Sequence, residues 1–135
     1  MVDSIAALSE RLEAAGVPFA VIGAAAMSAR GFPRQTLDFD LLVTDRRVLE
    51  GRFWEGVGTA AEIRVGDGDD PLAGVVRFAR PAVDVIVGRF RWQGEALARA
   101  TRLQVGGRAL PVATLGDLIL LKLHAGASAT RPTCG

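Results

Sequence analysis

Two aspartates stand one residue apart at the start of an apolar run, Asp38 and Asp40 in the stretch "RQTLDFDLLVTD". In a β-strand, residues i and i+2 face the same side, so these two carboxylates lie next to each other and repel. A divalent cation removes that conflict, because Mg²⁺ is bound by one or two carboxylates together with substrate phosphates. A structural explanation is also open, in which Asp38 caps the preceding turn and Asp40 pairs with an arginine.

A third carboxylate, Asp84, lies inside the apolar stretch "AVDVIVG", whose alternation predicts a strand with its valines on the buried face. A charge in such a strand is costly unless it is paired or bound to a metal. If this strand lies beside the strand of Asp38 and Asp40, three carboxylates can hold two metals about 3.5 to 4 Å apart, as in-line phosphoryl transfer requires. The alternative is an edge-strand aspartate that faces water.

Several residues before the paired aspartates are of kinds that can bind a phosphate group or position a metal ligand. In "VIGAAA" a strand ends at Gly23 and a helix begins at once, so free N–H groups and the positive end of the helix dipole are available, and Ala24 adds no bulk. A tight strand–helix turn is the simpler explanation of this stretch taken alone. Arg34 can clamp a phosphate through two hydrogen bonds, and Thr36 can orient Asp38. Otherwise these two residues are a solvated loop residue and a turn hydroxyl.

The elements that must position these residues follow from the hydrophobic periodicity. We expect helices over 3–16, 24–30, 45–57, 91–100 and 113–126, and strands over 17–23, 38–43, 61–65, 74–80, 82–88 and 102–112. The strands over 74–80 and 82–88 are expected to pair as a hairpin around Pro81, and 102–112 to fold as a hairpin at Gly106-Gly107. Gly16 is expected to end the first helix, Asp45 to lie near the start of the third, and Thr114 to cap the last. This order predicts an α/β (α+β) domain, a mixed β-sheet with helices packed on it. We expect the domain to cover 1–126 and a disordered or truncated tail to cover 127–135.

The composition limits the class of protein. The 135 residues fit one domain, and with 50% apolar and 23% charged residues the chain is typical of globular proteins. A formal net charge of +1 gives no strong field for DNA, membranes or acidic partners. The single cysteine, Cys134, excludes an internal disulfide, which fits a reducing compartment. Without a signal peptide or a long apolar run, we expect a cytoplasmic protein that does not bind a membrane.

Taken in order, these motifs resemble the nucleotidyltransferase superfamily typified by DNA polymerase β. Its pattern is a strand, Gly-Gly or Gly-Ser, a helix, a strand with Asp-x-Asp, and an acidic residue on a later strand. The chain is more similar still to minimal bacterial nucleotidyltransferases of the abortive-infection toxin type. Their hydrophobic-Gly-x-Ala, Arg-x-Thr-x-Asp-[Ile/Phe]-Asp and late Asp-Leu-x-x-x-Lys motifs correspond here to "VIGAAA", "RQTLDFD" and "DLILLK", within residues 5–126.

The resemblance implies a role for each matched residue. Asp38 and Asp40 would bind two Mg²⁺ ions, with Mn²⁺ as the alternative. Asp84 would complete the site of the catalytic metal and help to activate the attacking hydroxyl. Lys122 matches the lysine of the late helix, and it either reaches the nucleotide or extends from an apolar helix face into water. The nucleotide-binding set implied in this way is Gly23, Ala24, Arg34, Thr36 and Lys122.

The implied activity is metal-dependent transfer of a nucleoside monophosphate from an NTP to an acceptor hydroxyl on an RNA end, a protein or a small molecule. A toxin–antitoxin pair is the setting that the resemblance suggests. The alternative is a weak or inactive module of the same fold that binds a nucleotide or a partner protein and acts as antitoxin or regulator. Ala24, where many active members have Gly or Ser, and the short stretch after the late helix favour the module. The full set of Asp38, Asp40 and Asp84 favours the enzyme.

Overall fold

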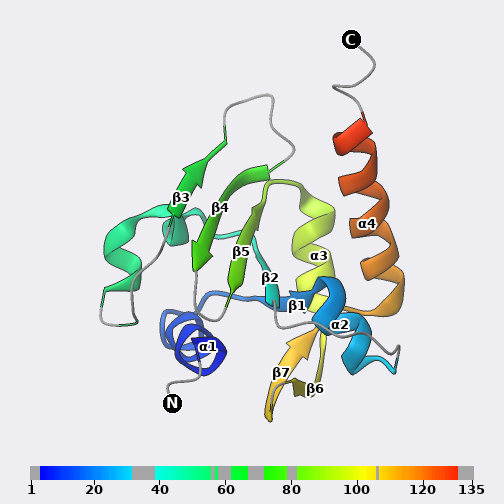
Figure 1. Ribbon diagram of the computed structural model, residues 1–135, viewed down its shortest axis with the longest axis horizontal. Coiled ribbons are helices and arrows are strands. Elements are labelled where there is room, and N and C mark those ends of the chain that lie inside the picture. The colour runs from blue at the N-terminus through cyan, green and yellow to red at the C-terminus, as the bar shows by residue number, and fades with distance from the viewer. Residues whose placement is uncertain are drawn as a thin grey trace.

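The computed structural model describes residues 4–31, 39–55, 57, 62–66, 72–78, 82–105 and 107–130. Within them the chain alternates short helices with the strands of one sheet (Figure 1). The α-helices are α1 Ser4–Ala14, α2 Gly23–Ala29, α3 Arg91–Arg99 and α4 Leu115–Thr130, and two 3-10 helices are η1 Arg46–Leu49 and η2 Gly51–Trp54. The strands are β1 Ala20–Ile22, β2 Phe39–Val43, β3 Glu62–Val65, β4 Leu72–Phe78, β5 Val83–Gly88, β6 Thr101–Val105 and β7 Arg108–Val112.

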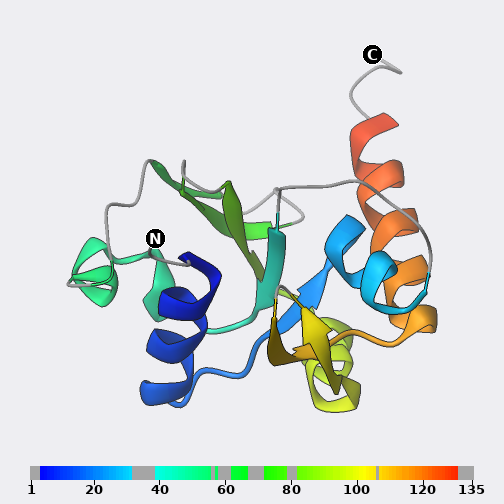
Figure 2. The same ribbon diagram turned by 60° about the horizontal axis from the view of Figure 1, so that its bottom comes forward.

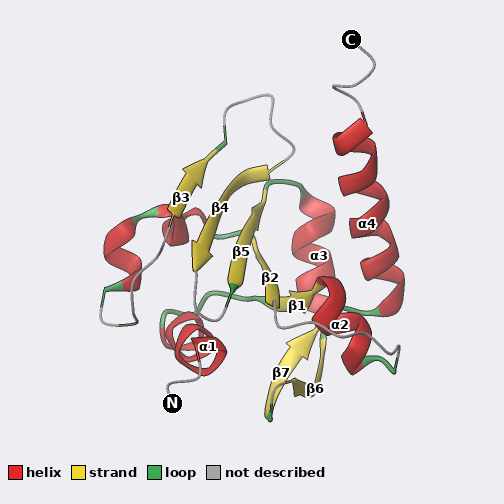
Figure 3. Cartoon of the chain, viewed as in Figure 1, coloured by secondary structure: helices red, strands yellow, loops and turns green. Residues whose placement is uncertain are grey.

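The seven strands form one mixed sheet in the order β3-β4-β5-β2-β1-β7-β6. The pairs β2–β5 and β1–β7 are parallel, and the other neighbours are antiparallel. The expected hairpins β4–β5 and β6–β7 are present, with Gly107 at φ +85° in the turn of the second. Figure 3 shows the helices arranged around this sheet, and the predicted mixed sheet with packed helices is confirmed.

The two faces of the central strands differ in burial. On one face of β2 and β5, the side chains of Leu41, Val43, Val83, Val85 and Val87 are completely buried. The other face carries Asp84 and Ile86, which are only partly buried. The alternation in "VDVIVG" therefore predicts the faces of β5 correctly, because burying the valines fixes which side the aspartate must take.

The helix α1 lies on one side of the molecule, and α2 and α4 lie next to each other on the opposite side (Figures 1 and 2). The end of α1 is the one predicted, at Gly16 with φ +72°. The N–H of Val17 donates to the carbonyl of Leu12 at 2.9 Å, and that of Gly16 donates to the carbonyl of Glu13 at 3.1 Å. This pair of bonds satisfies carbonyls that the helix end would leave without partners.

The single helix predicted over 45–57 is wrong, because this stretch forms the two short helices η1 and η2. Glu50, between them, has an extended backbone with φ −95° and ψ 130°. The buried indole of Trp54 donates from Nε1 to the carbonyl of Val48 at 2.8 Å, so the side chain takes an acceptor that a continuous α-helix would use itself. Asp45 does start η1, since its carboxylate accepts the N–H of Arg47 at 2.9 Å.

The helix α4 begins as predicted, with the Thr114 hydroxyl accepting the N–H of Asp117 at 3.2 Å. Its backbone stays helical to Thr130, so the helix continues past the boundary expected at 126. The division into a domain over 1–126 and a tail over 127–135 stays a prediction. In the part of the chain that is described, no helix is both long and apolar enough to cross a membrane.

Candidate active site

Asp40 and Asp84 are direct neighbours on the parallel strands β2 and β5. Residues paired in this way face the same side of a sheet, on strands about 4.8 Å apart. Because β5 lies between β4 and β2, the edge-strand explanation of Asp84 is wrong. The adjacency on which the predicted metal site depends is therefore present for two of its three carboxylates. The third, Asp38, lies outside the described residues.

Gly23 lies against the side chain of Asp40. It follows Ile22, the β1 partner of Asp40, and has φ +71°, a conformation that side chains disfavour. A Cβ added at Gly23 would lie 2.6 Å from Oδ2 of Asp40, well inside contact distance. The sequence predicts that this glycine lets a ligand approach the backbone. The structure shows in addition that the glycine leaves room for the Asp40 carboxylate.

A pocket of about 370 Å³ opens beside Asp40, between the sheet, α2 and α4. Its size is within the range of small-molecule sites. Among the residues that line it, only Asp40 and Lys122 carry charged side chains, and Lys122 is exposed. The full lining is Ile22, Gly23, Ala24, Met27, Asp40, Ile86, Leu118, Ile119, Leu121 and Lys122. The pocket thus has an apolar wall with one acidic and one basic group.

Two sets of contacts, to α3 and to the residue before it, hold α4 against this pocket. Arg99 donates to both carboxylate oxygens of Asp117, at 3.0 Å from Nε and 2.7 Å from Nη2, and the Asp117 side chain is only 4% exposed. These hydrogen bonds lower the pKa of Asp117 below its ordinary value. Further along, His124 lies edge-on to the rings of Phe90 and Trp92, each at 5.5 Å between centroids. In "DLILLK", Asp117 therefore fixes the helix, and Lys122 lies at the pocket.

A single arginine anchors α2 on the other wall of the pocket. Arg30 donates from Nε to the carbonyl of Ala113 at 3.1 Å, and from Nη2 to the carbonyl of Val112 at 3.0 Å and the Thr101 hydroxyl at 2.8 Å. These partners belong to β6, β7 and the residue after β7. The end of α2 is thus tied to the far part of the sheet, which fixes the helix that begins at Gly23.

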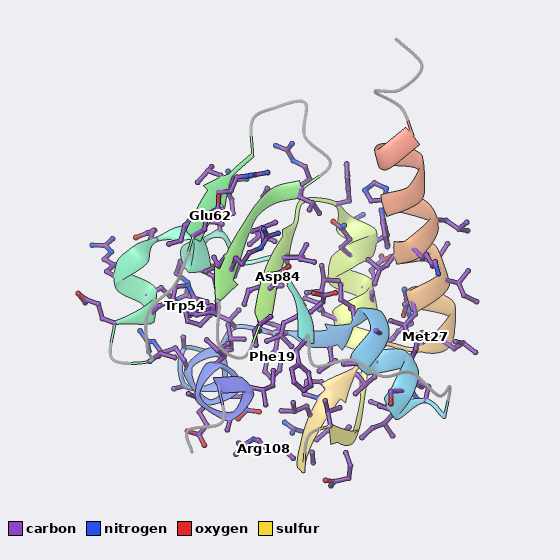
Figure 4. All side chains as sticks on the ribbon, viewed as in Figure 1. Phe19, Met27, Trp54, Glu62, Asp84 and Arg108 are labelled. Atoms are coloured by element: carbon purple, nitrogen blue, oxygen red, sulfur yellow. The ribbon has the colours of Figure 1, made fainter. Side chains whose placement is uncertain are left out.

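Arg77 is part of the site, although the sequence analysis did not select it. It is the β4 partner of Asp84, and its Nε donates to Oδ1 of Asp84 at 3.1 Å. The alternation in "GVVRFAR" places Val75 and Arg77 on one face of a strand, which was the available signal. Figure 4 shows Asp84 between Met27 of α2 and Glu62 of β3, so it lies between the pocket and the outer strand of the sheet.

The predicted site residues divide into two groups. Gly23, Ala24, Asp40 and Lys122 line one pocket, and Asp84 is the neighbour of Asp40. Arg34, Thr36 and Asp38 lie outside the described residues, so their places stay predictions. Adjacent carboxylates are the hard oxygen donors that a divalent cation takes, so the chemistry of the donor set fits a metal. Within the described ranges no three acidic, histidine or cysteine side chains gather, and the predicted triad therefore depends on Asp38.

Comparisons with known proteins show the family and the fold of the chain. A family model described as nucleotidyl transferase of unknown function (DUF2204) matches residues 1–132. No curated protein matches the chain in sequence. A candidate nucleotidyltransferase from Thermotoga maritima has a similar structure, with a TM-score of 0.67 at 15% identity over 96% of this chain and 87% of that chain.

The antibiotic-resistance factor ANT(2'')-Ia is also similar in structure. Its solution structure gives a TM-score of 0.57 at 21% identity over 86% of this chain and 66% of that chain. Its crystal structure in complex with adenylyl-2''-tobramycin gives a TM-score of 0.59 at 19% identity, over 91% of this chain and 74% of that chain. At these identities the likeness concerns the fold, which is that of the nucleotidyltransferases.

Proposed function

The chain belongs to the DUF2204 family of nucleotidyl transferases of unknown function, and from that premise we propose that it transfers a nucleoside monophosphate from an NTP to an acceptor hydroxyl in a metal-dependent reaction. The observation that supports this most is the register of β2 and β5, in which Asp40 and Asp84 are neighbours beside the pocket. Carboxylates so placed suit metal-dependent phosphoryl chemistry, because a divalent cation relieves the repulsion between like charges that lie opposite each other in a sheet.

In the proposed reaction the acceptor oxygen forms a bond to the α-phosphorus of the NTP. The bond from that phosphorus to the oxygen bridging the α- and β-phosphates breaks, and pyrophosphate leaves. Asp84 takes the proton of the acceptor hydroxyl. Asp38, Asp40 and Asp84 would hold two Mg²⁺ ions, or Mn²⁺, which supply charge stabilisation to the phosphates and lower the pKa of the bound hydroxyl.

The other residues of the site bind and orient the nucleotide. The wall of Met27, Ile86 and Leu121 offers apolar contact to the nucleoside, and the charge of Lys122 faces the triphosphate. The backbone at Gly23 and Ala24 approaches the phosphates without hindrance from a side chain. Arg34 and Thr36 belong to the same nucleotide-binding set by family likeness.

The acceptor classes that we propose are an RNA end, a side chain of a protein and a small molecule, in a cytoplasmic setting. ANT(2'')-Ia was seen with an adenylylated aminoglycoside, which shows that a small-molecule acceptor is compatible with this fold. By family likeness we propose that the protein acts within a toxin–antitoxin pair, with a cognate protein as its partner.

The test is incubation with each α-labelled NTP and Mg²⁺, in the presence of total RNA, cell protein or an aminoglycoside. Label transfer to one acceptor is expected, with a loss of about 100-fold or more in Asp84→Asn. An absence of label above that variant with all three acceptors would refute the proposed activity.

Ala24 is the observation that supports a second candidate, a nucleotide-binding module without transfer. It lines the pocket where many active relatives have Gly or Ser. In that case Mg²⁺ and NTP would raise the melting temperature of the protein, and no label would appear in any acceptor.

A further inference from the structure

Charged residues form one row across four neighbouring strands of the sheet. The register pairs Asp40 of β2 with Asp84 of β5, Asp84 with Arg77 of β4, and Arg77 with Glu62 of β3. Paired residues face the same side, so the row reads negative, negative, positive, negative from the pocket outward. Arg77 is the basic member of this row, and it lies directly beside a proposed metal ligand.

The contact between Arg77 and Asp84 is easily displaced. It consists of the 3.1 Å bond from Nε to Oδ1, and the two side chains are 57% and 30% exposed. Exposed pairs of this kind contribute little free energy. The pair Arg99–Asp117 shows the contrast, since there the arginine donates to both oxygens of a carboxylate that is 4% exposed. The same two residue types thus make a fixed bridge in one place and a displaceable one at the site.

We propose that Arg77 is the resident counterion of Asp84 and competes with the divalent cation for that carboxylate. The inference rests on the metal-dependent function proposed above. Arg77 lies one strand away from Asp84, on the side opposite Asp40, so any cation shared by the two carboxylates lies near its guanidinium. Repulsion between these positive charges weakens metal binding.

The consequence is an order of binding. A metal that arrives with a triphosphate brings anionic ligands of its own, whereas a free metal must displace Arg77 with the carboxylates alone. The protein therefore binds free divalent cations weakly and binds them tightly only together with NTP. Arg77 in this account is a positioning residue that sets the metal affinity of the site, and it does not touch the reacting atoms.

The experiment measures Mn²⁺ binding to the metal-free full chain by titration calorimetry, without nucleotide. Arg77→Gln is expected to lower the dissociation constant by about 3- to 10-fold, because it removes a competing charge. Arg77→Lys keeps the charge and is expected to stay within about twofold of wild type. The matched control is Arg64→Gln on β3, an exposed arginine whose ion-pair partner is Glu62 at 3.8 Å, and its dissociation constant is expected not to change.

A second measurement uses the melting temperature in EDTA. Arg77→Gln is expected to melt close to wild type, because an exposed pair contributes little free energy, and to gain more from added Mn²⁺ than wild type gains. An unchanged or weaker Mn²⁺ affinity in Arg77→Gln would overturn the proposal, as would an equal shift in Arg77→Lys or in Arg64→Gln. The absence of Mn²⁺ binding in both wild type and Arg77→Gln would overturn it as well.

Failure of this inference is distinguishable from failure of the proposed function. Label transfer by the wild-type protein with NTP present decides the function, whatever the affinity for free metal. Tighter Mn²⁺ binding in Arg77→Gln, together with no transfer in wild type, would support the counterion role of Arg77 and refute the proposed transfer activity.

Discussion

Substitution of Gly23 by alanine adds one methyl group at the point where β1, α2 and Asp40 meet. The new Cβ would lie 2.6 Å from Oδ2 of Asp40, and ordinary contact begins at 3.4 Å. The carboxylate must therefore retreat by about 0.8 Å, and it cannot do so along a long flexible chain, because an aspartate has only two rotatable side-chain bonds. Gly23→Ala is thus a small change that displaces a proposed metal ligand without removing it.

The expected magnitudes come from two separate effects. An alanine at φ +71° costs about 1 to 2 kcal/mol of folding stability, which lowers the melting temperature by about 3 to 10 °C in a domain of this size. A misplacement of about 1 Å at a reacting centre can reduce the rate about 100-fold. We therefore expect kcat/KM for label transfer to fall about 10- to 100-fold in Gly23→Ala.

The chain offers a matched control in Gly16→Ala. Gly16 has nearly the same backbone conformation, with φ +72°, but a Cβ there meets nothing within 4 Å. Both variants are expected to melt at similarly reduced temperatures, because the backbone strain is the same. Only Gly23→Ala is expected to lose transfer activity and Mn²⁺ affinity.

The assay is label transfer from an α-labelled NTP at a temperature at least 10 °C below the melting point of either variant, with melting followed by circular dichroism. If Gly23→Ala matches Gly16→Ala in activity as well as in stability, then the position of the Asp40 carboxylate does not matter for transfer. That result would refute the reasoning from the Gly23–Asp40 contact.

Other predictions follow from the contacts that hold α2 and α4 at the pocket. Asp117→Asn is expected to lower the free energy of unfolding by about 1 to 3 kcal/mol at pH 7. Because the folded pKa is lowered, this contribution is complete above the ordinary value of about 3.9 and disappears as pH falls through the folded pKa, so urea melts of wild type and variant should converge in acid. Arg30→Ala removes hydrogen bonds to Ala113, Val112 and Thr101, and is expected to cost about 1 to 3 kcal/mol and to raise KM for NTP. An unchanged KM would show that α2 keeps its place without this anchor. Lys122→Met keeps the apolar stem and removes the charge, so KM for NTP should rise about 10-fold at unchanged melting temperature; equal KM values would assign Lys122 to the helix surface.

The faces of the central strands were predictable because burial decides them. In "VDVIVG" the valines must face the core, so the aspartate between them faces outward, and the structure has this arrangement. The two hairpins were also predictable, because they depend on turn residues between strands that are close together in the sequence. That Asp40 and Asp84 are neighbours did not follow, since it depends on the order of strands from distant parts of the chain, and sequence periodicity says nothing of that order.

The failures have equally specific causes. The helix expected over 45–57 is interrupted because the Trp54 indole takes the carbonyl of Val48, a side-chain-to-backbone hydrogen bond within the stretch that helix periodicity cannot reveal. Arg77 was missed because its position beside Asp84 depends on the exact register of the β4–β5 hairpin, and a shift of one residue would turn it to the other face. The wall of the pocket was likewise hidden, because Met27, Ile86 and Leu118 look like core residues in the sequence.

The central claim is that Asp40 and Asp84 act as one unit at a single site. The most direct test compares label transfer by Asp40→Asn, Asp84→Asn and the double variant, all shown to be folded by circular dichroism. Since groups that act together are not additive, each single variant is expected to lose about 100-fold or more, and the double variant is expected to be no slower than the slower single one. Losses that multiply in the double variant, or full activity in either single variant, would contradict the account.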